Sequence, residues 1–122
     1  MPTGSRTEYD KWRDEVLRTR IATGDLLREW GLVSIRLRAC SQPWFNYPTC
    51  PVSDAIKIAN RARKLLKRVG ELKAWSIRLD IKPGRVEQYR ELVEKLEELD
   101  ITLTKIINEV DVLIAQVVRN QS

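Results

Sequence analysis

The strongest sign of chemistry in this sequence is a cluster of basic residues. A stretch of 17 residues that begins at Lys57 holds seven basic residues and one acidic residue, Glu71, so its net charge is +6, whereas the whole chain carries +5. Lys57, Arg61, Lys64 and Arg68, called here the basic stripe, follow a spacing of four, three and four residues. In a helix this spacing places them on one face. Lysine and arginine on one face can neutralise successive phosphates, so the stripe predicts contact with a polyanion such as nucleic acid.

Two structural explanations of the basic stripe compete with a functional one. A charged stripe is typical of the solvent face of an amphipathic helix. The stripe could also pair with an acidic stripe farther along the chain, at Glu87, Glu91, Glu94 and Glu98.

The register of two antiparallel helices predicts how much of this pairing is feasible. If the chain reverses at its proline-glycine turn, Arg68 lies opposite Glu97 and Glu98 and is compensated. Farther from the turn, Arg61 and Lys64 fall opposite uncharged residues. We therefore expect the half of the stripe that begins at Lys57 to be largely uncompensated.

The connection before this helix adds residues that suit nucleic-acid binding. Arg36 and Arg38 precede it and are expected at the same end of the molecule as Lys57, and the connection itself contains three aromatic residues. Aromatic rings can stack on unpaired bases while neighbouring arginines contact phosphates, although such rings can equally cover the end of a hydrophobic core. The candidate nucleic-acid-binding residues are Arg36, Arg38, Trp44, Phe45, Tyr47, Lys57, Arg61 and Lys64.

The residue types needed for catalysis are scarce. The chain has no histidine, which removes the commonest general base and the commonest metal ligand. Cys40 and Cys50 alone cannot complete a tetrahedral zinc site, and no phosphate-binding loop or dinucleotide fingerprint is present. We expect no enzymatic activity, no cofactor and no metal. Two cysteines without a secretory signal are more typical of reduced thiols than of a disulfide.

Helix signals define the elements that would position these residues. Glycine and proline are concentrated in a few places, which indicates few and long helices, over about residues 8–40, 53–80 and 85–119. Thr7 is a candidate N-cap of the first helix, and Ser53 of the second. Gly24 and Gly31 weaken the first helix, and a break near Gly31 would give a fourth helix.

Each predicted helix has an apolar stripe with heptad spacing. In the first helix it runs through Trp12, Val16, Thr19, Thr23, Leu26, Trp30, Val33 and Leu37. In the second it runs through Ile58, Ala62, Leu65, Val69, Leu72, Ser76 and Leu79. The third has the cleanest pattern, at Tyr89, Leu92, Leu96, Leu99, Leu103, Ile106, Val110, Leu113 and Val117.

These stripes predict one all-α domain over residues 1–122, an antiparallel bundle of three long helices with coiled-coil-like seams. No apolar run is long enough to span a membrane, and the first residues lack the apolar stretch of a secretory signal, so we expect a cytoplasmic protein. Because the last seam residues, Leu113 and Val117, extend beyond the second helix, they must meet the connection, the first helix or another chain.

Two functions fit this architecture. The first is a non-catalytic adaptor that binds nucleic acid, or a nucleic-acid-processing enzyme or complex, through its basic end. The second is a structural or assembly protein that homo-oligomerises through the third-helix seam. In architecture and charge alone, such a short basic bundle resembles accessory proteins of phages and mobile elements, including those that partner reverse transcriptases. No motif here is specific to them, so the resemblance implies no residue roles.

Overall fold

Three long helices account for most of the chain. The computed structural model describes residues 7–40, 42 and 50–121, and within them the chain forms α1 (Glu8–Cys40), α2 (Val52–Ile77), a short 3-10 turn (Pro83–Arg85) and α3 (Val86–Gln121). No strand occurs among these described residues. The predicted all-α class is confirmed.

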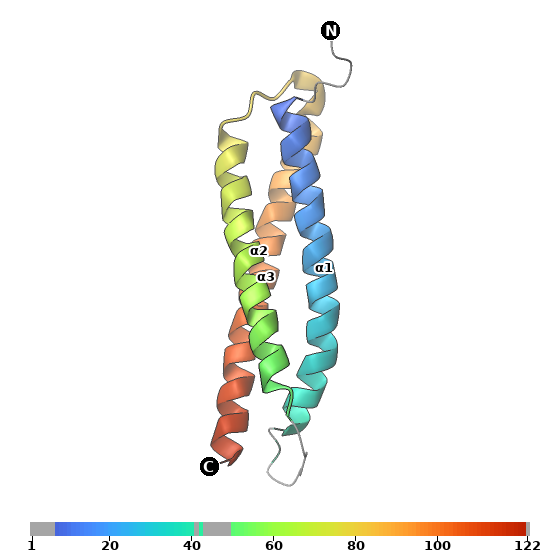
Figure 1. Cartoon of the computed structure of the whole chain (residues 1–122). Coiled ribbons are helices and arrows are strands. Elements are labelled where there is room, and N and C mark those ends of the chain that lie inside the picture. Colours follow the sequence, from blue (N-terminus) through green and yellow to red (C-terminus); the bar gives the residue numbers. More distant parts are fainter. Residues whose placement is uncertain (1–6, 41, 43–49, 122) are drawn as a thin grey trace.

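The helices lie side by side in an up-down-up bundle (Figure 1). α1 and α3 run in the same direction and α2 runs against both, so the chain reverses once between α1 and α2 and again between α2 and α3. Each helix packs against the other two. The end of α1, the start of α2 and the end of α3 therefore share one end of the bundle.

The core consists of the predicted seams. Eight of the nine predicted α3 seam residues are buried, and the ninth, Tyr89, is half-buried. The predicted α1 seam is buried except for the half-buried Val33. In α2, Leu65 and Leu79 are half-buried and the other five seam residues are buried. Leu113 is 7% exposed and Val117 is 0% exposed within the single chain, so self-association is not needed to cover them.

The α1 seam contains buried hydroxyl groups. Thr19 and Thr23 donate hydrogen bonds to the carbonyl oxygens of Glu15 and Thr19, each at 2.8 Å. Because each hydroxyl bonds to its own helix, its burial leaves no unsatisfied polar atom.

α1 is continuous through Gly24 and Gly31, so the predicted alternative of a fourth helix is wrong.

The helix ends agree with the predictions in part. The hydroxyl oxygen of Thr7 accepts the Asp10 backbone N–H at 3.1 Å, and the Asp10 carboxylate accepts the Thr7 hydroxyl at 2.9 Å, which confirms the predicted N-cap. α2 begins at Val52 with Pro51 as its N-cap residue, so Ser53 lies inside the helix and its predicted capping role is wrong. α2 also ends at Ile77, before the predicted boundary at position 80.

Cys40 and Cys50 form a disulfide, so the reduced-thiol interpretation is wrong. The physical reason is the antiparallel packing of α1 and α2, which places the last residue of α1 at the same end of the bundle as the residues that precede α2 (Figure 1). The two Cα atoms are 6.0 Å apart, within the range that a disulfide spans. The bond joins α1 to the start of α2 at the basic end of the bundle.

Candidate nucleic-acid interface

Two members of the basic stripe are neutralised by α1. Arg68 donates a hydrogen bond of 2.7 Å to Glu15, and Arg61 forms an ion pair with Glu29. The bond from Arg68 holds the pKa of the Glu15 carboxyl below its ordinary value. The expectation that Arg61 is uncompensated is therefore wrong, because the stripe lies on the flank of α2 that faces α1.

The predicted pairing of Arg68 with Glu97 and Glu98 is also wrong. Lys73, on the other flank of α2, takes that place, with its Nζ atom 3.1 Å from Glu97 and 2.7 Å from Asp100. The hydrogen bond to Asp100 raises the pKa of the Lys73 ammonium. Glu98 pairs instead with Lys95 of its own helix, at 2.7 Å. The α3 carboxylates therefore lie near α2, as expected from the register, but on the flank opposite to the one predicted.

Around the basic stripe, four cations remain exposed after these pairs are made. Lys57, Lys64, Lys67 and Arg36 make no ion pair with any residue in the described parts of the chain. Lys57 and Lys64 lie two turns apart on one face of α2, about 10 Å along the helix, and Lys67 is one turn beyond Lys64. We call Lys57, Lys64 and Lys67 the α2 basic surface.

Arg36 extends this surface onto α1. It lies two turns after Glu29, the residue that pairs with Arg61 of α2, so Arg36 is on the flank of α1 that faces α2. The antiparallel arrangement also places Arg36 at the end of the bundle where α2 begins. Arg36 and Lys57 therefore lie at one end and on one side of the molecule, as predicted.

Arg38 belongs to a different surface. Its guanidinium lies 3.8 Å from Glu109 of α3, and it lines a shallow hollow of about 600 Å³ on the α1–α3 side, together with Ile101 and Val112. The expectation that Arg36 and Arg38 form one uncompensated cluster is wrong, because residues two positions apart in a helix point to different sides. Trp44, Phe45 and Tyr47 lie outside the described residues.

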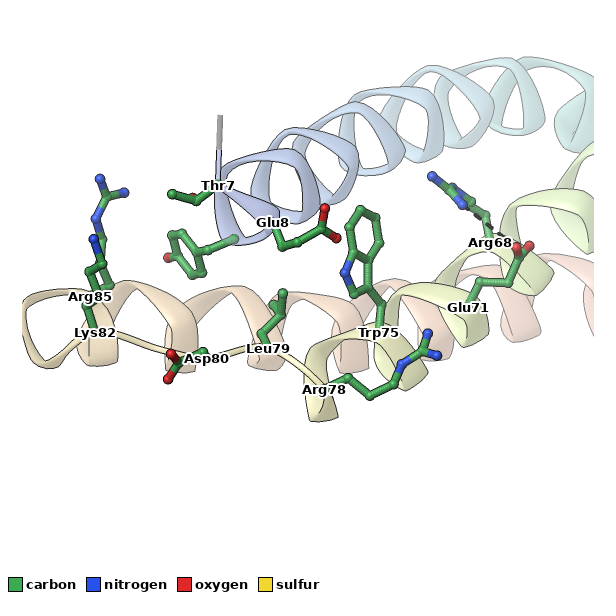
Figure 2. A pocket seen from close by; sticks show the side chains of 11 residues that line it. Thr7, Glu8, Arg68, Glu71, Trp75, Arg78, Leu79, Asp80, Lys82 and Arg85 are labelled. Atoms are coloured by element: carbon green, nitrogen blue, oxygen red, sulfur yellow. Dashed lines mark ion pairs between the residues drawn. The ribbon is translucent and has the colours of Figure 1, made fainter. Parts of the chain in front are cut away.

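A second hollow, of about 750 Å³, lies at the opposite end of the bundle (Figure 2). Figure 2 shows Trp75 between the first turn of α1 and the last turns of α2, with Leu79 beside it. The indole N–H groups of Trp12 and Trp30 donate to the Leu72 carbonyl oxygen and to Glu109, both at 2.9 Å. The Trp75 N–H has no hydrogen-bond partner among the described residues.

The charges around this second hollow are mixed. Its wall carries four cations, Arg68, Arg78, Lys82 and Arg85, and three carboxylates, Glu8, Glu71 and Asp80. Arg68 and Arg85 are engaged with acidic residues of α1, so the hollow has no clear preference for an anion. This hollow was not predicted from the sequence. The available signal was Trp75, which lies seven residues after Arg68 and so continues the basic stripe.

Comparison with protein-family models, with curated protein sequences and with solved structures gives no match. In the part of the chain that the structure describes, no helix has the length and apolar character to cross a membrane, and no cluster of three or more acidic, cysteine or histidine side chains could hold a metal ion.

Proposed function

We propose that this protein is a non-catalytic adaptor that binds nucleic acid, or an enzyme already bound to nucleic acid, through the α2 basic surface and Arg36. The observation that carries the proposal is the set of four exposed cations on one side of the bundle that no described carboxylate neutralises. A cation that already forms an ion pair within the fold gains less binding free energy from contact with a phosphate than an unpaired cation does.

The chemistry of these cations favours binding with weak sequence preference. Lysine ammonium groups contact phosphates as point charges, and phosphate contacts carry no base information. If four phosphates are neutralised, log affinity falls against log salt with a slope of about −3 to −4. Binding then weakens steeply towards physiological ionic strength, so a partner bound to the same nucleic acid would strengthen it.

Fluorescence anisotropy with a labelled oligonucleotide of random sequence, over a series of salt concentrations, tests this proposal. We expect the double variant Lys57→Glu/Lys64→Glu to lose binding. The matched control is Lys95→Glu/Lys105→Glu on α3, which makes the same change in net charge. Equal binding by the two variants, or no binding by the unmodified protein at low salt, would show that the α2 basic surface is only a solvated helix face.

A cytoplasmic location is part of the same proposal and conflicts with the disulfide, because cytosolic proteins seldom keep such bonds. Trapping thiols by alkylation at the moment of cell lysis tests the location. Free Cys40 and Cys50 thiols would support the cytoplasm, and a retained bond would indicate an oxidising compartment.

The alternative function is assembly through the α3 seam. It would require exposed apolar residues at the end of that seam, but Leu113 and Val117 are buried within one chain.

A further inference from the structure

The outer face of α1 is apolar although nothing in the described chain covers it. Ile21, Leu32 and Ile35 are 65%, 70% and 67% exposed, and Leu17 is also exposed. At 100° per residue these four side chains fall within an arc of about 60°, on the opposite side of α1 from its buried seam. Figure 1 shows α1 running along one side of the bundle. α1 is therefore apolar on two faces.

The spacing on this outer face is that of a second helical seam. Residues at intervals of four, three, four, three and four form a line that we call the outer seam of α1: Leu17, Ile21, Gly24, Arg28, Gly31 and Ile35. A Cβ atom added at Gly24 or Gly31 would meet no atom within 4 Å, so packing within the chain does not require glycine there. Glycines in an apolar seam let another helix approach closely.

We propose that the outer seam binds the same seam of a second copy of this chain, with the two α1 helices antiparallel. The seam is self-complementary in that direction. With a two-fold axis that crosses the outer face of α1 at the level of position 26, Leu17 meets Ile35 of the partner subunit, and Ile21 meets Gly31 of the partner subunit. Arg28 then lies over Gly24 of the partner subunit, where no side chain obstructs it. Nearly the whole length of α1 overlaps in this register.

The position of Arg28 in the seam selects the antiparallel direction. Arg28 already pairs with Asp25 of its own chain at 2.9 Å, and in the dimer it also lies next to Asp25 of the partner subunit. The two Asp25 carboxylates approach each other across the axis, and an Arg28 lies beside each. A parallel pair would set Arg28 against Arg28 of the partner subunit in the middle of the seam.

The mass of the protein in solution, measured by sedimentation equilibrium over micromolar to millimolar concentrations, tests the dimer. The chain mass is 14.2 kDa, and we expect twice that value at the upper concentrations. Ile21→Asp/Ile35→Asp should raise the dissociation constant at least about tenfold, because each carboxylate would be buried against an apolar seam. The matched control is Ile77→Asp/Ile101→Asp, which changes two exposed isoleucines outside α1 and should leave the dimer intact.

Cysteine cross-linking tests the direction of the pair. The described native cysteines are already bridged to each other, so introduced cysteines are the reactive thiols. Under mild oxidation, a mixture of the Leu17→Cys and Ile35→Cys variants should give a mixed disulfide dimer, and each variant alone should not. A monomeric mass at every concentration, a dimer that survives Ile21→Asp/Ile35→Asp, or cross-linking of each variant with itself would each overturn the proposal.

Discussion

α1 and α3 have similar lengths and pack side by side, yet their residues are distributed in different ways. α3 has one apolar seam, without a polar residue among its buried positions, and its exposed side is mostly charged or polar, with Ile101 and Val112 as isolated apolar residues. α1 places Thr19, Thr23 and Ser34 in its buried seam and Ile21 and Ile35 on its outer side. α3 is thus specialised for one buried contact. The composition of α1 divides apolar residues between the core and a second, exposed surface.

The largest expected effect tests the α3 side of this comparison. Leu103→Ala removes a fully buried side chain from the middle of the seam, and we expect a loss of about 2–5 kcal/mol in the free energy of unfolding. The control is Ile101→Ala, an exposed residue two positions away, for which a change within about 0.5 kcal/mol is expected. Urea unfolding followed by circular dichroism measures both. Equal effects would mean that the α3 seam is not the core.

A second prediction concerns the covalent bond that ties α1 to α2, a link that α3 lacks. Cys40→Ser/Cys50→Ser opens a loop closed across ten positions, and we expect it to cost roughly 2–4 kcal/mol, mainly because the unfolded chain gains freedom. Thermal unfolding of this variant, compared with the oxidised and the reduced parent protein, measures the effect. If the reduced parent matched the oxidised one, the disulfide would contribute nothing to stability.

The sequence predicted the helices and their seams because both follow from local periodicity. The spacing of Leu96, Leu99 and Leu103 determines which side of α3 is buried, whatever the partner helix is. The disulfide was not predictable in the same way, since the approach of Cys40 and Cys50 depends on how the end of α1 and the start of α2 are placed against each other. The cap of α2 was wrong by two residues because Pro51 and Ser53 are both acceptable residues near a helix start.

The candidate site was predictable only in part, for a related reason. The spacing of Lys57, Arg61 and Lys64 shows that they share one face of α2, but not which neighbouring helix lies beside that face. Glu29 of α1 neutralises Arg61, and this contact depends on the rotation of α2 in the bundle. The outer seam of α1 was visible as a second period in the sequence. It was missed because one buried seam already explained the helix.

A third prediction concerns the polar middle of the α1 seam. Thr23→Val replaces a hydroxyl that bonds only to its own helix, at the Thr19 carbonyl oxygen, with a methyl group of similar size. No buried polar partner is left unsatisfied, so we expect a change in unfolding free energy of at most about 1 kcal/mol, in either direction. Leu103→Thr in α3 is the contrast, since it puts a hydroxyl into a purely apolar seam. Urea unfolding compares them, and a Thr23→Val loss as large as that of Leu103→Thr would show that the α1 hydroxyls stabilise the bundle.

The smallest expected effects distinguish how α1 and α3 are attached to α2, through the pH dependence of stability. Glu15 of α1 bonds to Arg68, which lowers the pKa of its carboxyl in the folded protein below the ordinary 4.5. Its contribution is therefore present above about pH 4.5 and is lost as pH falls through the lowered folded pKa. For Lys73, which bonds to Asp100 of α3, the pKa is raised above 10.5, so its contribution is present below that pH and is lost at higher pH.

Two single variants separate these contributions. Glu15→Gln should lose up to about 1 kcal/mol at neutral pH, as expected for a partly exposed ion pair, and its difference from the unmodified protein should shrink in acid. Lys73→Met should show a deficit of similar size at neutral pH that shrinks in alkali. Urea unfolding at a series of pH values measures both differences. A Glu15→Gln deficit that stayed constant down to the lowest pH would mean that packing of the Glu15 side chain, and not its charge, joins α1 to α2.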